Sequence, residues 1–138
     1  MQTKIPYGKT ALSFVLPKGH EGAIVTSNID ELKAEVSQEQ LVKNAMAKPF
    51  GGKKLSELAV GKNNCVLIIS DHTRPVPSKV ILPSMLAELR QGNPDIDITL
   101  LVATGFHRAT TDAELRAKLG DEIFESEKIV VHDAQDAS

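Results

Sequence analysis

The sequence of 138 residues is poor in cysteine and in aromatic side chains. A single cysteine, Cys65, excludes an internal disulfide bond and favours a cytoplasmic protein, since small secreted domains usually carry several cysteines. Tryptophan is absent and aromatic residues make up only 4% of the chain, so aliphatic side chains must fill the core.

Strong net charge and long apolar segments are also missing. The formal net charge of −2 and the isoelectric point near 6.1 give no sign of binding to nucleic acid or to an anionic membrane surface. No apolar run approaches the roughly 20 residues of a membrane-spanning helix, and residues 1–6 lack the apolar segment of a signal peptide. The hydrophobic content of 41% is enough for one core in a chain of ordinary domain size.

The second half of the chain alternates between strand and helix patterns. Apolar runs at 65–70, 96–103 and 128–132 predict strands, and apolar spacing with capping residues predicts helices over 78–91 and 111–120. Such alternation is typical of a parallel sheet with helical crossovers. We therefore expect an α/β fold, namely a Rossmann-like three-layer domain with a mostly parallel sheet.

The first half of the chain carries weaker signals. Residues 4–16 surround Gly8 and indicate an N-terminal antiparallel β-hairpin. Capping and turn residues predict two short helices at 37–47 and 54–59. We expect the whole of residues 1–138 to form a single α/β domain.

Two clusters of polar residues follow directly on two of the predicted strands. The carboxyl ends of parallel strands share one rim of a sheet, and neighbouring strands lie about 4.8 Å apart. If these strands are neighbours, the clusters converge on one crevice. The candidate site residues are Asp71, Thr73 and Arg74 after the strand at 65–70, and Gly105, His107 and Arg108 after the strand at 96–103.

These side chains suit the binding and the acid–base chemistry of an anion. Arg74 offers a planar fork for a carboxylate or a phosphate. His107 follows Gly105, which permits a sharp turn and close approach of a ligand, and histidine is a general base near neutral pH. Structural interpretations stay open, with Asp71 and Arg74 as a local ion pair and with His107 and Arg108 as solvated surface residues.

Other polar residues give weaker indications. His72 and His132 occupy positions where a histidine is more often structural. A metal site built from Asp71, His72 and His107 is conceivable, although no close pair has a familiar ligand spacing. The charged positions expected to be ordinary solvated helix faces are Glu88, Arg90, Glu114, Arg116 and Lys118.

Two segments, 70–75 with Pro77 and 103–108, resemble the two signatures of the nickel-pincer lactate racemase family. Residues 7–8 and 132–133 add weaker support. The resemblance covers essentially all 138 residues, but only the N-terminal domain of proteins that are normally much longer. It therefore implies a longer, two-domain racemase whose C-terminal domain is absent from this chain.

The resemblance implies racemisation or epimerisation of 2-hydroxy acids. In that family a pyridinium-derived nucleotide carrying nickel, the nickel-pincer nucleotide, accepts hydride from the substrate carbon while a histidine removes the hydroxyl proton. The resemblance makes His107 that acid/base histidine, and Asp71, Thr73 and Arg74 line the cleft for cofactor and substrate. The lysine that tethers the cofactor, the nickel ligand and a second acid/base histidine would lie beyond residue 138.

This division of the active site has consequences for partners and activity. The implied partners are a small 2-hydroxy acid, the C-terminal domain of the same protein and cofactor-maturation proteins, and the isolated chain should be inactive. Two other interpretations of the residues stay open. One is a small α/β module that binds an anionic metabolite or nucleotide without catalysis, and the other is a metal-dependent hydrolase using Asp71 and His107.

Overall fold

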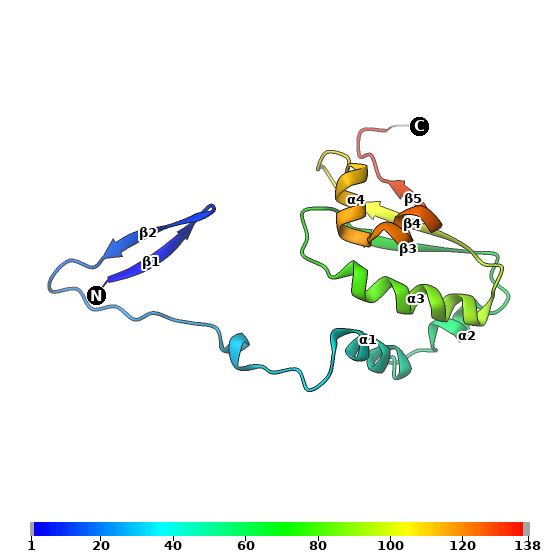
Figure 1. Ribbon diagram of the computed structural model, residues 1–138, viewed down its shortest axis with the longest axis horizontal. Coiled ribbons are helices and arrows are strands. Elements are labelled where there is room, and N and C mark those ends of the chain that lie inside the picture. The colour runs from blue at the N-terminus through cyan, green and yellow to red at the C-terminus, as the bar shows by residue number, and fades with distance from the viewer. Residues whose placement is uncertain (1, 137–138) are drawn as a thin grey trace. The chain divides into compact units, whose positions relative to one another are not determined.

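An antiparallel hairpin opens the chain in the computed structural model, which describes residues 2–136 (Figure 1). Strand β1 (Gln2–Tyr7) pairs with β2 (Thr10–Val15), and the turn between them places Gly8 at a φ of 56°. Such a positive φ favours glycine, which explains why the hairpin signal lay at this residue. The predicted N-terminal hairpin is confirmed.

The chain divides into two compact units, one ending at Glu35 and one beginning at Val36. Besides the hairpin, the first unit contains a single 3-10 turn, η1 (Asn28–Glu31), among its described residues. The second unit contains all the remaining helices and strands. That residues 1–138 form a single domain stays a prediction.

A parallel sheet of three strands forms the centre of the second unit. Strands β3 (Asn64–Ser70), β4 (Asp97–Ala103) and β5 (Lys128–Val131) lie in the order β3-β4-β5, and both pairs are parallel. The register pairs the last residue of β3, Ser70, with the last residue of β4, Ala103. The loops that follow these two strands therefore leave the sheet side by side.

Helices connect the strands and pack together. Helix α3 links β3 to β4, helices α4 and α5 link β4 to β5, and α1 and α2 contact α3 (Figure 1). The bounds of the five helices are α1 (Gln38–Ala47), α2 (Leu55–Ala59), α3 (Ser78–Gly92), α4 (Asp112–Leu119) and α5 (Asp121–Ser126).

Two helical details differ from what simple signals indicate. Helix α3 is continuous through Pro83, although a proline inside a helix removes one backbone hydrogen bond. The helix predicted to end at Gly120 does end there, but α5 follows at once. Gly120 has a φ of 88°, so it separates two short helices rather than ending helical structure altogether.

The helices α2 and α3 approach each other unusually closely. A β-carbon on Gly92, at the end of α3, would lie 1.9 Å from the carbonyl oxygen of Ser56 in α2. No side chain fits at this distance, so glycine is required for the packing of these two helices rather than for a turn.

One face of the sheet packs against the helices and forms the core. Alternate residues of β4 point into it, as the period of a strand requires, and they meet leucines of α3 and α4. The buried hydrophobic residues are Ala59, Ile69, Leu82, Leu86, Leu89, Ile96, Ile98, Leu100, Val102, Leu115, Leu119 and Ile123.

The other face of the sheet is not covered by the helices of the second unit. Val66 and Ile68 of β3 are 56% and 72% exposed, and Val130 of β5 is 42% exposed. The α/β class, the parallel sheet and the hairpin are confirmed. Residues 36–136, however, supply helices to one face only, so the third layer of the predicted architecture is not among them.

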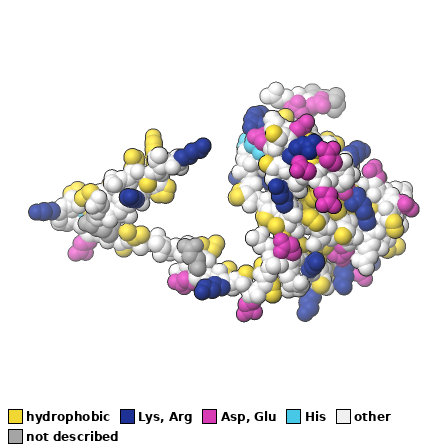
Figure 2. All heavy atoms as spheres, viewed as in Figure 1, with side chains coloured by type: hydrophobic (Ala, Val, Ile, Leu, Met, Phe, Trp, Pro, Cys, Tyr) yellow, Lys and Arg dark blue, Asp and Glu magenta, His cyan; other side chains and the backbone are white. Residues whose placement is uncertain are grey.

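The surface of the second unit carries charges of both signs. Figure 2 shows its lysine, arginine and carboxylate side chains interspersed over the face in view, which agrees with the small net charge of −2. Among residues 2–136, no helix has both the length and the apolar composition needed to cross a membrane.

Candidate functional site

The two polar loops meet at the carboxyl rim of the sheet, as their strand pattern predicts. Asp71 follows β3 directly, and its Oδ2 lies 2.5 Å from Nδ1 of His107 in the loop after β4. The backbone N–H of His107 donates to the carbonyl of Thr104, and Gly105 adopts a φ of 57° inside this turn. Residues 36 positions apart in the sequence thus form a direct acid–histidine contact.

Asp71 is buried and contacts both Thr73 and His107. It is only 2% exposed, and its Oδ1 accepts hydrogen bonds from the hydroxyl of Thr73 at 2.7 Å and from the backbone N–H of Thr73 at 3.1 Å. The Thr73 hydroxyl, followed by His107, lowers the pKa of this carboxyl to about 2. Asp71 is therefore an ionised acceptor at neutral pH.

The ionised carboxylate sets the tautomer of His107. Because Asp71 can only accept, Nδ1 of His107 carries the proton in their contact, and in the neutral ring Nε2 is left as the acceptor. The His107 side chain remains 47% exposed. The imidazole is thus held at one end and open to a ligand at the other.

Two hollows lie beside this imidazole. One, of about 470 Å³, is lined by both loops and by the ends of β3 and β4, and includes Asp71, Arg74 and His107. The other, of about 400 Å³, lies between residues 106–109 and 132–135. His107 lines both, so it forms part of the wall that they share.

The two arginines of the loops have different surroundings. Arg74 is exposed and lines the larger of these hollows, and its guanidinium makes no ion pair or side-chain hydrogen bond within residues 2–136. The local ion pair with Asp71 is therefore not formed. Arg108 instead holds Glu114 through two nitrogen–oxygen contacts, of 2.9 and 2.6 Å. The predicted binding of substrate or cofactor by Gly105 and Arg108 is not tested by these contacts, but the pairing with Glu114 leaves the Arg108 guanidinium less available to a ligand than that of Arg74.

Two charged residues that were expected to be solvated in fact support the site. Glu114 forms a capping box with Thr111 at the start of α4, and its contact with Arg108 holds its pKa well below the usual range. Lys118 donates from Nζ to the carbonyl of Arg74 at 3.1 Å. Burial lowers the pKa of Lys118, and the nearby negative charge of Asp71 opposes that shift.

Local sequence patterns do not reveal the contacts of Glu114 and Lys118, for two different reasons. The Thr111-to-Glu114 spacing was visible as a capping signal, but nothing in it indicates that the carboxylate would also hold Arg108. Lys118 lies 44 residues from Arg74, and no local pattern links them. Only the packing of α4 beside the rim reveals that contact.

The remaining histidines of the rim make structural contacts. Nδ1 of His72 lies 3.1 Å from the hydroxyl of the buried Thr110. The buried Thr104 donates its hydroxyl to the carbonyl of His132 at 2.7 Å, which ties the end of β5 to the end of β4. Within residues 2–136, no three histidine, cysteine or acidic side chains make a group that could hold a metal ion.

One polar atom of the rim has no partner. The hydroxyl of Ser70 is buried and makes no hydrogen bond within residues 2–136, although it lies at the edge of the hollow lined by Arg74. A buried hydroxyl without a partner is costly, so this position fits a further polar group. Together with the unpaired guanidinium, it suits an anionic organic ligand, whereas the described residues offer no ligand set for nickel.

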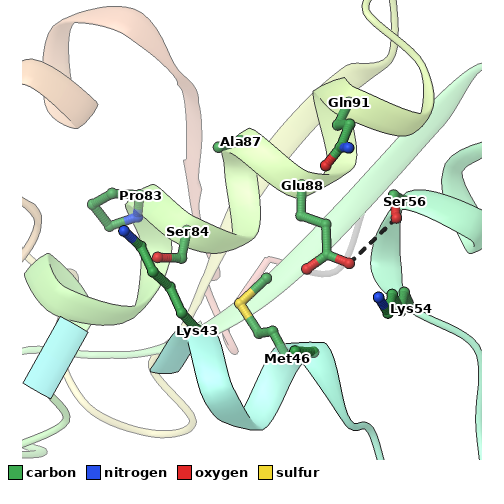
Figure 3. Close-up of a pocket in the computed structure, with 10 residues that line it drawn as sticks. Lys43, Met46, Lys54, Ser56, Pro83, Ser84, Ala87, Glu88 and Gln91 are labelled. Carbon is green, nitrogen blue, oxygen red and sulfur yellow. Dashed lines mark hydrogen bonds between the residues drawn. The ribbon is translucent and has the colours of Figure 1, made fainter. Parts of the chain in front are cut away.

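A further hollow, larger than the two at the rim, lies away from them. It has a volume of about 540 Å³ and is bounded by α1, α2 and α3 (Figure 3). Met46 and Pro83 contribute apolar surface, and its carboxylate, Glu88, accepts a hydrogen bond from the Ser56 hydroxyl at 3.3 Å. It contains none of the candidate site residues, so size alone is a poor guide to the functional site here.

Fold and site together define a parallel α/β domain that carries an aspartate–histidine contact and an exposed arginine at the carboxyl rim of its sheet. Residues 7–138 match the family model described as the lactate racemase N-terminal domain. The chain belongs to this family, which confirms the resemblance found in the two loop motifs.

Two curated relatives and one solved structure agree with this assignment. The chain is 46% identical to the lactate racemase of Thermoanaerobacterium thermosaccharolyticum and 41% identical to that of Lactiplantibacillus plantarum, each over 134 residues. These alignments cover 97% of this chain and 32% of each relative. The structure of the lactate racemase apoprotein from T. thermosaccharolyticum matches with a TM-score of 0.83 at 44% identity, over 99% of this chain and 31% of that one. The chain thus spans about a third of the length of these relatives.

Proposed function

We propose that the full-length protein racemises a small 2-hydroxy acid, with lactate as the first substrate to test. In this proposal the present chain supplies one wall of the active site. The observation that carries it is the Asp71–His107 contact beside the unpaired Arg74 in a single hollow. The names of the relatives, which are lactate racemases, support the choice of reaction.

Arg74 would bind the substrate carboxylate. A guanidinium presents two parallel N–H donors that match the two oxygens of a carboxylate, and Arg74 has no competing ion pair within residues 2–136. Anchoring the carboxylate at this point brings the neighbouring hydroxyl of a 2-hydroxy acid toward the imidazole of His107, which lines the same hollow. Binding and orientation are thus assigned to one side chain.

His107 would move the proton of the substrate hydroxyl. Its Nε2 accepts that proton as the bond from carbon to hydrogen is broken, and it returns the proton when that bond is remade on the other face of the carbon. Asp71 stabilises the imidazolium that forms in between and keeps Nδ1 protonated. Thr73 holds the carboxylate in position through its two hydrogen bonds, so its proposed role is to position Asp71.

Breaking the carbon–hydrogen bond also requires a hydride acceptor, and we propose that a nickel-pincer nucleotide supplies it. The unpartnered hydroxyl of Ser70, at the edge of the hollow, fits a polar part of such a group, while Arg74 is assigned to the substrate carboxylate. The tether and the nickel ligand are proposed to come from the C-terminal part of the full-length protein. The isolated chain would then be inactive. The complete protein would be located in the cytoplasm and would need maturation proteins that make its cofactor.

The test is the His107→Asn variant of the full-length protein, loaded with cofactor and assayed with each lactate enantiomer. General acid–base catalysis contributes about 100- to 10,000-fold, so the variant should lose at least about 100-fold in turnover. His20→Asn is the matched control, because His20 lies in an exposed loop of the first unit. Undiminished turnover of His107→Asn, with the fold verified by circular dichroism, would refute the assigned role.

A further inference from the structure

The uncovered face of the parallel sheet carries a continuous apolar row. Ile68, Leu101 and Val130 are partners in the strand register, so they lie side by side across β3, β4 and β5. Val66 lies two residues before Ile68 and therefore faces the same way. We call these four residues the open face. Ile68 is 72% exposed and Val66 is 56% exposed.

Such a face is unusual for a parallel sheet. Parallel sheets are normally covered by helices on both sides, because crossover helices pack on them and their strands are apolar throughout. The helices of residues 36–136 cover only the opposite side, where Leu100 and Val102 are fully buried. Contiguous exposed apolar surface of this kind marks an interaction site.

The open face leads directly to the candidate active site. Ser70 and Ala103 follow on the same side of the sheet, and both line the hollow that contains His107, as Ile68 does. A group that covers the open face therefore also lies beside the edge of this hollow.

The length of the relatives indicates what covers this face. They are about three times as long as the aligned region, which makes up 32% of each. We propose that a helix from the remaining part of the full-length protein packs an apolar stripe on the open face. This proposal goes beyond the racemase reaction, because it requires only that the protein extends as its relatives do.

The first experiment measures access to the open face by thiol labelling. In the full-length protein without its native cysteines, Cys65 included, the I68C variant is treated with a maleimide. The matched control is V60C, since Val60 is 65% exposed against 72% for Ile68 but lies at the end of α2. After normalisation to the unfolded protein, I68C should react at least about tenfold more slowly, because a covered side chain reacts only through local opening.

Equal labelling of I68C and V60C would overturn the proposal. The occupant is identified separately by incorporating the diazirine analogue photo-leucine in place of leucine and mapping the crosslinks formed from Leu101. Crosslinks to residues beyond 138 are expected, whereas crosslinks to the N-terminal hairpin or to a second copy of the protein would contradict it. Neither measurement uses racemase activity, so a failure here is distinguishable from a failure of the proposed reaction.

Discussion

The two loops at the rim, residues 71–77 and 104–111, have similar compositions but different internal contacts. Each begins with a buried polar residue, Asp71 or Thr104, and each contains one arginine. In the first loop the buried group is ionised and contacts the histidine of the other loop. In the second loop the buried hydroxyl ties two strand ends together instead.

The arginines show what this difference means. Arg108 already has a carboxylate partner in Glu114, so its charge is matched within the protein. Arg74 has none within residues 2–136, and it faces the hollow. An arginine at a pocket binds a ligand better when its charge has no partner within the protein. By this criterion Arg74 is a better candidate for ligand binding than Arg108.

Among the arginines and threonines of the two loops, the largest effect is expected from removing Arg74. Charge-assisted hydrogen bonds contribute about 1.5–3 kcal/mol, so Arg74→Ala should lower kcat/KM of the full-length enzyme roughly 10- to 100-fold. Arg108→Ala should leave kcat/KM nearly unchanged, because an exposed ion pair contributes little. Steady-state kinetics with a 2-hydroxy acid measures both. Equal losses of kcat/KM in the two variants would contradict the conclusion that Arg74 is more available to a ligand than Arg108.

A smaller effect is expected from the two threonines. Thr73→Val removes one donor to Asp71 and should lower kcat roughly two- to tenfold, the contribution of a single hydrogen bond, while Thr73→Ser restores it. Thr104→Val should leave kcat unchanged and lower the melting temperature by about a few degrees, since the carbonyl of His132 loses its donor. Kinetics and thermal unfolding on both variants separate the roles. A loss of kcat in Thr104→Val but not in Thr73→Val would contradict the roles assigned to the two threonines.

The last expected effect concerns the stability of the fold at acid pH. The pKa of Asp71 is about 2 in the folded protein against 3.8 ordinarily, so the unfolded chain binds more protons between these values. The stabilisation from Asp71 is therefore complete above pH 3.8 and is lost as the pH falls through about 2. Urea unfolding of the wild type and of Asp71→Asn should show a difference that shrinks over this range. A difference independent of pH would contradict the assignment.

The sequence predicted the parts of the structure that depend on local patterns. The strand expected at 65–70 is Asn64–Ser70, and the helix expected at 78–91 is Ser78–Gly92, because apolar periodicity is read over neighbouring residues. The meeting of Asp71 with His107 was also predictable, since it follows from strand order. The local signals did not reveal α5, which has only six residues, beginning directly after a glycine.

The contacts of individual charged side chains were not predictable in the same way. The sequence does not show that Arg108 pairs with Glu114 while Arg74 has no such partner, and it gives no reason to connect Lys118 with a loop 44 residues earlier. Such contacts depend on how helix α4 packs beside the rim. They are properties of the tertiary structure, so the composition of a loop alone cannot tell which of its charges is available to a ligand.

The register of β3 and β4 couples the Asp71–His107 contact to the hydrophobic core. Asp71 meets His107 because Ser70 is aligned with Ala103, and that alignment places Leu100 and Val102 in the core. A slip of one residue would turn these two side chains outward and move the acid away from its histidine. Residues of the core therefore determine the spacing of Asp71 and His107, and a redesigned core could keep the fold while losing this contact.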